Sequence, residues 1–221
     1  MRIAAFESGQ RSDLPLIGRS LASVDLGFGV SKTCGIALRG AGNRPKPILR
    51  SFGGCVSYIA KLISEGAIDS LIVEAPLSGI FNNDGDPQWR RPFEQQPGID
   101  KTERRYWYTQ PGSTVCLAAV AFFNRLSQAI LKCDKRVRVY EGFFTFKPKG
   151  KSDHCYDAAR LAEAAQDPSV GVYYEVAAPK GGQLLTVLSL VGAVEADSLA
   201  PAVIACRADR GGPNTAHDSG T

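Results

Sequence analysis

The stretch SVDLGFGVSKTCGIAL, residues Ser23 to Leu38, decides the interpretation of the chain. A strand-like apolar segment carries one acid, Asp25, and glycines at Gly27 and Gly29 follow before a second apolar run. Two such runs joined by a short glycine-containing connection predict a β-hairpin. An Asp in the first strand that is followed two residues later by glycine lies where backbone can approach a ligand or metal closely, although an Asp-x-Gly alone is more often turn chemistry. Asp25 is therefore the first candidate site residue.

Composition places the chain among soluble globular proteins. It has 221 residues, of which 44% are hydrophobic and 22% charged, and its net charge of +4 permits a polyanionic partner without requiring one. Six scattered cysteines form no CxxC pair, and the first residues contain no apolar targeting segment. The apolar run Leu184 to Val194 is too short to span a bilayer. We expect a cytoplasmic protein with no membrane partner; the sequence also allows an oligomer.

A second acid ends an apolar strand. Leu71 to Val73 form a continuous apolar run that predicts a strand buried on both faces, and Glu74 follows directly. The carboxyl end of such a strand is where open α/β sheets bind ligands. Upstream, Ile48–Phe52 is predicted as a strand and Ser57–Ser64 as a helix.

Further acids lie in the second half of the chain. Ser113–Lys132 predicts a well-buried helix, and Arg136–Glu141 alternates as a strand that ends on Glu141. Ser152 is a good N-cap for an alanine-rich helix up to residue 165, in which Asp153 and Asp157 are four residues apart and share a face.

Basic residues gather before this helix. Residues 132–151 hold seven basic side chains against two acids, which favours a phosphate-facing edge over a merely solvated loop. The long segment 78–112 also interleaves arginines with aromatics, as in Arg104-Arg105-Tyr106. Such residues can stack bases and contact phosphates, but acids of equal number allow an internally ion-paired loop as well.

We expect a core over residues 20–168 that contains the insertion 78–112. An N-terminal extension (1–19) precedes it, and a C-terminal annex of the same domain (169–208) and a disordered tail (209–221) follow.

Several carboxylates that converge on one site are most readily explained by a metal, because alone they repel one another. Oxygen-only ligation suits Mg²⁺ or Mn²⁺, and two such ions about 3.5–4 Å apart stabilise both the attacking and the leaving oxygen of a phosphodiester.

The ordered motifs VDLG, IVEAPLS, VYEGF and HCYDAARLAEAA resemble the ribonuclease H-like superfamily, in particular its predicted nucleases and more distantly RuvC-type Holliday junction resolvases. The resemblance covers about Val24 to Ala165. It implies an α/β fold in which a mixed central sheet opens with an antiparallel hairpin and is flanked by helices. It also implies that Asp25, Glu74 and Asp157 bind the metal, and that Asp153 or Glu141 contributes a fourth acid.

Two further features bear on this resemblance. His154 is a candidate proton shuttle, although a lone histidine is more often structural. Arg160 occupies the position at which RuvC-type helices carry a second aspartate, and this departure weakens the comparison with resolvases and with a two-ion site.

The leading hypothesis is a divalent-metal-dependent nuclease, a hydrolase that cleaves phosphodiester bonds in DNA or RNA. Its expected nucleic-acid contacts are Lys147, Lys149, Lys151, Arg104 and Arg105. Asp25-Leu26-Gly27 followed by Ser31-Lys32-Thr33 also resembles the phosphate-binding hairpin of the actin and sugar-kinase superfamily, but 221 residues are too few for the two domains of those enzymes. A third hypothesis is a nucleic-acid-binding module with a degraded site.

Overall fold

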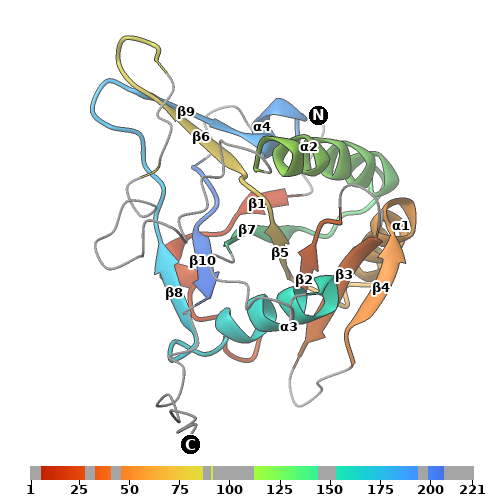
Figure 1. The fold of residues 1–221 in the computed structure, drawn as a ribbon. Coiled ribbons are helices and arrows are strands. Elements are labelled where there is room, and N and C mark those ends of the chain that lie inside the picture. Colours follow the sequence, from red (N-terminus) through yellow and green to blue (C-terminus); the bar gives the residue numbers. More distant parts are fainter. Residues whose placement is uncertain are drawn as a thin grey trace, which may run out of the picture.

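The fold is built on a mixed central sheet. The computed structural model describes residues 6–27, 33–40, 46–86, 91, 112–143, 153–193 and 199–206. The strands follow one another across the sheet in the order β4 (Ile48–Ser51), β3 (Thr33–Arg39), β2 (Leu21–Asp25), β5 (Ser70–Glu74), β7 (Val137–Phe143), β10 (Val203–Cys206) and β8 (Gly171–Tyr174) (Figure 1). β1 (Phe6–Ser8) pairs with the first part of β7.

Strand directions match the expected fold class. β2 and β3 form the antiparallel hairpin predicted from Ser23–Leu38, and β4 continues it antiparallel to β3. β5 runs parallel to β2, and β7 runs parallel to β5. The α/β class, with a mixed central sheet that opens with an antiparallel hairpin, is therefore confirmed.

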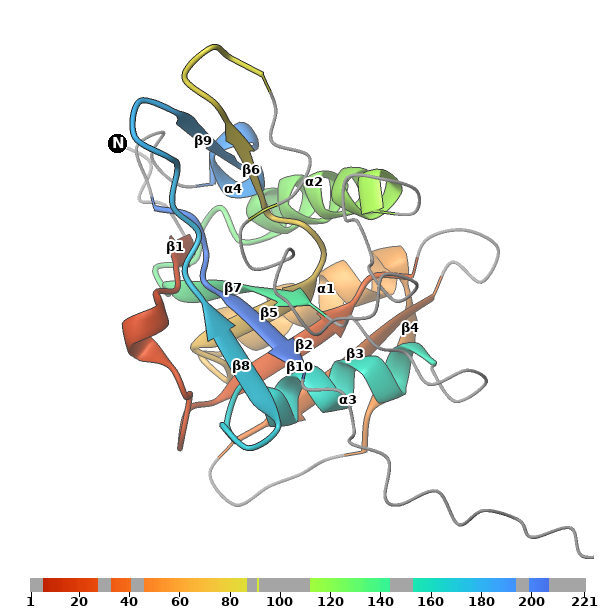
Figure 2. The same cartoon turned by 60° about the vertical axis from the view of Figure 1, so that its left-hand side comes forward.

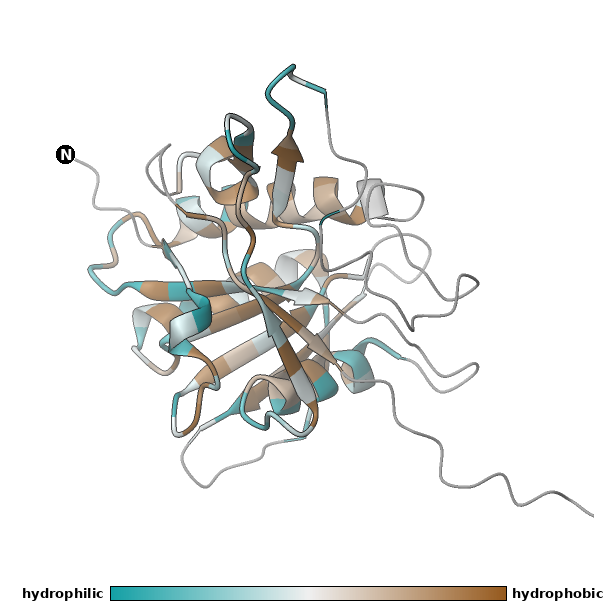
Figure 3. Ribbon diagram, turned by 90° about the vertical axis from the view of Figure 1, so that its left-hand side faces the viewer, coloured by the Kyte–Doolittle hydropathy of each residue, from teal (hydrophilic) through white to brown (hydrophobic). Residues whose placement is uncertain are grey.

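Helices cover both faces of this sheet. α1 (Phe52–Ser64) and α2 (Gly112–Ala129) pack on one face, and α3 (His154–Ala164) packs on the other (Figure 2). All residues of β5 are buried, as predicted for a strand covered on both sides. Val73 packs with the α1 and α2 cluster and Ile72 with the α3 cluster, so the two faces alternate along the strand. Apolar residues concentrate in the central strands (Figure 3).

Two helices begin at residues other than the predicted ones. α1 starts at Phe52 rather than Ser57, because the Ser51 hydroxyl accepts a hydrogen bond from the Gly54 N–H (3.2 Å) and caps the helix ahead of its glycines. In α3 the N-cap is Asp153 rather than Ser152: its side chain accepts a hydrogen bond from the Tyr156 N–H at 2.7 Å. In both helices the first turn begins directly after the residue whose side-chain oxygen accepts a backbone N–H of that turn.

α2 is buried along one side only. Phe122, Phe123 and Leu126 are fully buried, whereas Leu117 is 68% exposed. The helix ends at Ala129, three residues before the predicted end, and Leu131 beyond it is exposed as well. The prediction of a well-buried helix is therefore wrong for much of its surface, because only one side of α2 faces the core.

The C-terminal part of the chain contributes to two sheets. β8 and β10 extend the central sheet beyond β7. β9 (Gln183–Thr186) instead pairs antiparallel with β6 (Ser78–Phe81), and this two-stranded arm projects from the core in Figure 1. A short helix, α4 (Val187–Leu190), follows β9, and a 3-10 turn, η1 (Arg11–Asp13), follows β1. Within the described ranges, no helix combines the length and apolar character needed to cross a membrane.

Candidate metal centre

Three acids from three separate elements meet on one face of the sheet. Asp25 ends β2, Glu74 ends β5 and Asp157 lies in the first turn of α3. Each offers a carboxylate oxygen, and these oxygens all lie within 4.8 Å of one another. All three residues are buried. The structure thus brings together the three acids proposed from the resemblance as metal ligands.

The register of the strands explains how two of these acids meet. Asp25 pairs with Glu74 across the parallel β2–β5 ladder, so both side chains point to the same face. Asp25 pairs with Gly35 on β3, and Glu74 pairs with Gly142 on β7. A row of glycine, aspartate, glutamate and glycine therefore crosses four strands beneath α3.

The two glycines of this row let the helix lie directly on the sheet. A Cβ at Gly35 would lie 1.8 Å from the carbonyl oxygen of His154. A Cβ at Gly142 would lie 2.9 Å from Leu161 Cδ1 and 3.3 Å from the Cα of Glu74. Any larger residue at Gly35 must push the start of α3 outward. The close approach brings Asp157, one turn into the helix, to the acids of the sheet.

Replacing Gly35 with alanine is therefore expected to separate the acids. Because the obstacle is helix backbone, α3 has to shift, and we expect unfolding free energy to fall by about 1–3 kcal/mol, as for other overpacked interiors. Mn²⁺ affinity should fall at least tenfold. Urea unfolding and calorimetric titration with Mn²⁺ measure the two effects.

Gly53→Ala is the matched control, since no atom lies within 4 Å of the added Cβ. It should stabilise the first turn of α1 slightly, because alanine is the better helix former. Equal behaviour of the two variants would contradict the role assigned to Gly35.

Glu141, considered as a fourth acid, is not part of this cluster. It pairs with Val73 rather than Glu74, so its side chain points to the opposite face of the sheet. There its carboxylate contacts the fully buried Arg91 guanidinium, at 2.6 Å for Oε1 and 2.7 Å for Oε2. Oε2 also accepts a hydrogen bond from the Leu77 N–H at 2.8 Å. Because Glu141 lies one residue out of register with Glu74, its side chain is on the other face of the sheet from the three acids.

Asp153, the other candidate for a fourth acid, is exposed and caps α3. Its side-chain oxygen is held by the Tyr156 N–H. The structure therefore gives Asp153 a structural task at the start of the helix and does not bring it into the three-acid cluster.

His154 contacts the cluster from the first residue of α3. Its Nδ1 lies 2.8 Å from Oδ2 of Asp25, and the histidine side chain is 30% exposed. This contact fixes the orientation of the Asp25 carboxylate and leaves part of the imidazole open to solvent. The role of His154 as a proton shuttle remains a prediction.

Cys206 lies on the α3 face of the sheet, where the charges of Arg160 and of two of the acids act on its thiol. Burial raises the pKa of the Cys206 thiol above its ordinary value, and the negative charges of Glu74, Asp157 and Glu163 raise it further. Arg160 acts on the same thiol in the opposite direction, and its guanidinium forms an ion pair with Glu163 at 2.9 Å. Arg160 is therefore a positive charge whose field overlaps that of Glu74 and Asp157.

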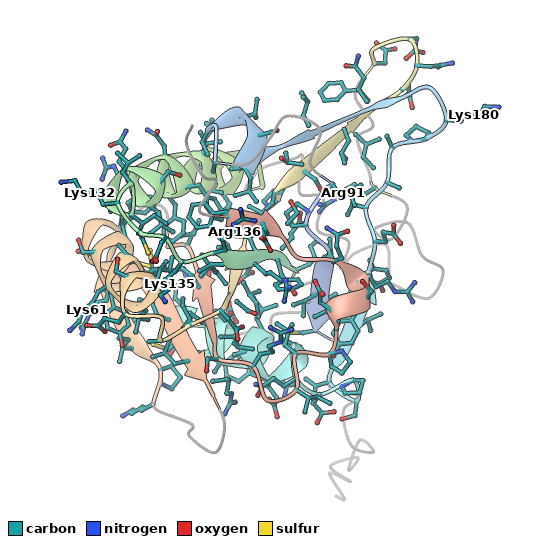
Figure 4. All side chains as sticks on the ribbon, turned by 180° about the vertical axis from the view of Figure 1, so that it is seen from behind. Lys61, Arg91, Lys132, Lys135, Arg136 and Lys180 are labelled. Carbon is teal, nitrogen blue, oxygen red and sulfur yellow. The ribbon has the colours of Figure 1, made fainter. Side chains whose placement is uncertain are left out.

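The predicted nucleic-acid contacts Lys147, Lys149, Lys151, Arg104 and Arg105 lie outside the described residues, as do Ser31 and Lys32 of the kinase-like motif. The described part of the basic run lies at the start of β7, where Arg136 pairs with Glu7 at 2.9 Å. Figure 4 shows Lys132 and Lys135 on the same side as Lys61. A seven-residue strand spans about 20 Å, so these cations are well separated from the acids at its other end.

Sequence reasoning missed three residues that shape this region. Gly35 and Gly142 each interrupt an apolar strand, and a glycine in a strand interior often marks a close approach of another backbone. Arg91 carried no comparable signal, because it lies in the run Trp89 to Phe93, whose mixture of arginines and aromatics does not indicate a buried ion pair. Its burial depends on Glu141, a residue 50 positions away.

The donor set suits a hard divalent cation. Mg²⁺ binds oxygen ligands at about 2.0–2.1 Å, which places them roughly 3–4.2 Å from one another. The carboxylate oxygens of the three acids lie within 4.8 Å of one another, so small side-chain movements would bring them to that spacing. The three acids are therefore the residues that would hold Mg²⁺ or Mn²⁺.

No protein-family model matches the chain, and no curated protein matches it. Among solved structures, one similar chain is a mutant nuclease domain of the large terminase subunit of bacterial virus Sf6, with manganese and beta-thujaplicinol. Identity is 10%, the match covers 83% of this chain and 85% of that chain, and the TM-score is 0.23.

Proposed function

We propose that the protein is a divalent-metal-dependent nuclease that hydrolyses phosphodiester bonds in nucleic acid. The observation that carries this proposal is the convergence of buried Asp25, Glu74 and Asp157 on one face of a ribonuclease H-like sheet. Buried carboxylates repel one another, and a bound cation offsets that repulsion. The proposed partner is DNA or RNA, because a phosphodiester presents the anionic oxygens that such a cation binds.

Asp25, Glu74 and Asp157 would hold Mg²⁺ or Mn²⁺. When bound, such an ion stabilises the negative charge that develops on the phosphate and acidifies bound water. In the overall reaction a water oxygen forms a bond to phosphorus and the bond from phosphorus to the leaving sugar oxygen breaks. The water gives up one proton, and the leaving oxygen takes up one.

The surrounding residues of the chain position this chemistry. His154 holds the Asp25 carboxylate through Nδ1, which sets the direction of its oxygens. Gly35 and Gly142 let α3 lie directly on the sheet, and this close packing sets the distance between Asp157 and the acids of the sheet. Both features restrict the geometry before any substrate arrives, as an efficient site requires.

Cleavage of labelled single-stranded, duplex, junction and RNA–DNA hybrid substrates tests the proposal. We expect hydrolysis of at least one class in Mg²⁺ or Mn²⁺ and none in EDTA. The preferred class identifies the substrate. Absence of cleavage together with absence of metal binding would contradict the proposal and favour a binding module.

Metal should also stabilise the fold. A ligand at 100 times its dissociation constant stabilises a protein by about 2.7 kcal/mol, so Mn²⁺ should raise Tm by several degrees. Glu74→Gln should lose most of this shift, whereas Glu65→Gln at the exposed end of α1 should retain it. Thermal unfolding with Mn²⁺ and then excess EDTA measures the effect. The same shift in both variants would place the metal elsewhere.

A further inference from the structure

Arg160 lies on α3, the helix that contributes Asp157 to the three acids. It follows Asp157 by three residues, so the two side chains are neighbours on one side of α3. The Arg160 side chain is 20% exposed, and Nη1 lies 2.9 Å from Oε2 of Glu163. Glu163, one helical turn further along α3, therefore restrains the Arg160 guanidinium.

The packing of α3 shows where Arg160 lies relative to the sheet. A Cβ at Gly142 would lie 2.9 Å from Cδ1 of Leu161, the residue after Arg160, and Gly142 pairs with Glu74. Arg160 therefore belongs to the turn of α3 that crosses the sheet at the level of the acids. In agreement with this place, the charges of Glu74 and Arg160 both act on the pKa of the Cys206 thiol, in opposite directions.

Charge and ligand number limit how many cations this site can hold. Within the part of the chain that the structure describes, three carboxylates meet, whereas Glu141 and Asp153 are engaged elsewhere. Their three negative charges exceed the charge of one divalent ion by one unit. A second divalent ion would have to share these carboxylates with the first, and the positive charges of the first ion and of Arg160 would repel it.

We propose that Arg160 supplies the second positive charge of the site, binding a phosphate oxygen of the substrate beside a single divalent ion held by Asp25, Glu74 and Asp157. The inference rests on the proposed nuclease function and specifies how its substrate is bound. A guanidinium suits this task because its planar set of N–H donors matches the oxygens of a phosphate. Arg160 is thus a substrate-binding residue at the position where RuvC-type helices carry a second aspartate.

The test compares Arg160→Ala and Arg160→Lys with the wild type. Calorimetric titration should show one Mn²⁺ per chain in each protein. Because the alanine variant lacks a positive charge near the acids, it should bind Mn²⁺ several-fold more tightly. The affinity of the Mn²⁺-loaded protein for inorganic phosphate should fall about tenfold, and cleavage should fall about 100-fold. Arg160→Lys should recover part of both losses, since it keeps the charge without the planar fork.

Arg125→Ala on α2 is the matched control, because Arg125 packs over Phe52 on the opposite face of the sheet. It should leave Mn²⁺ and phosphate affinity unchanged. Opposite changes in the two affinities separate a charge effect from general damage to the fold, which would weaken both. Two Mn²⁺ ions per wild-type chain, or unchanged affinities in Arg160→Ala, would overturn the inference while leaving the nuclease proposal intact. Failure of the wild type to bind Mn²⁺ would overturn both.

Discussion

Asp157→Asn is expected to abolish cleavage and to stabilise the metal-free protein. Asp157 contributes one of the three buried carboxylates, and asparagine keeps its shape without the charge. Loss of the bound ion removes several kcal/mol of transition-state stabilisation, so we expect cleavage to fall at least about 10³-fold. In EDTA the same substitution removes repulsion among the acids and should raise the free energy of unfolding by about 0.5–2 kcal/mol.

Asp153→Asn is the matched control for this prediction. It lies four residues earlier at the start of the same helix, and asparagine caps a helix about as well as aspartate. Cleavage and unfolding should both stay close to the wild-type values. Cleavage assays and urea unfolding in EDTA measure the two effects. If Asp157→Asn were inactive because it unfolds, its urea midpoint would fall rather than rise, and the role assigned to Asp157 would lose its support.

Arg91→Met is expected to cause the largest loss of stability in the protein. Both side chains of the Arg91–Glu141 pair have no exposed surface, and the guanidinium also donates to the Ser78 hydroxyl at 3.2 Å. Removing one partner leaves the other charge buried without compensation, which typically destabilises a protein by about 3–5 kcal/mol. The pair also holds the chain immediately after Glu74, because Glu141 accepts the Leu77 N–H. We therefore expect weaker Mn²⁺ binding as well.

The double variant Arg91→Met with Glu141→Gln identifies the cause. It removes both charges, so it should be more stable than Arg91→Met alone, with strong coupling between the two sites. Arg136→Met serves as the surface control, because the Arg136–Glu7 pair is largely exposed and should contribute less than about 1 kcal/mol. Urea unfolding of the wild type, Arg91→Met, Glu141→Gln, the double variant and Arg136→Met measures these differences. Additive losses at Arg91 and Glu141 would contradict a buried ion pair.

The sequence predicted the elements that a local pattern specifies. The hairpin around Asp25 and the buried strand before Glu74 follow from alternating or continuous apolar runs, and both are present. Asp157 could be placed near the start of a helix from the alanine-rich pattern and the preceding polar residues. These three elements already contain the acids that meet in the structure.

Features that depend on register or on distant partners could not be predicted in the same way. Glu141 follows an apolar strand much as Glu74 does, but a shift of one residue turns its side chain to the other face. Arg91 lies in a stretch that mixes arginines with aromatic residues, and only the fold brings it to Glu141. Hydrophobic pattern indicates which residues form a strand, whereas strand register and long-range pairing determine which polar groups meet.

Anomalous diffraction from crystals grown with Mn²⁺ would locate the metal directly. We expect one strong anomalous peak per chain, within about 2.3 Å of carboxylate oxygens from Asp25, Glu74 and Asp157, and no peak in crystals of Asp157→Asn. A peak at other residues, or no peak in wild-type crystals at saturating Mn²⁺, would contradict the claim that these acids form a metal centre.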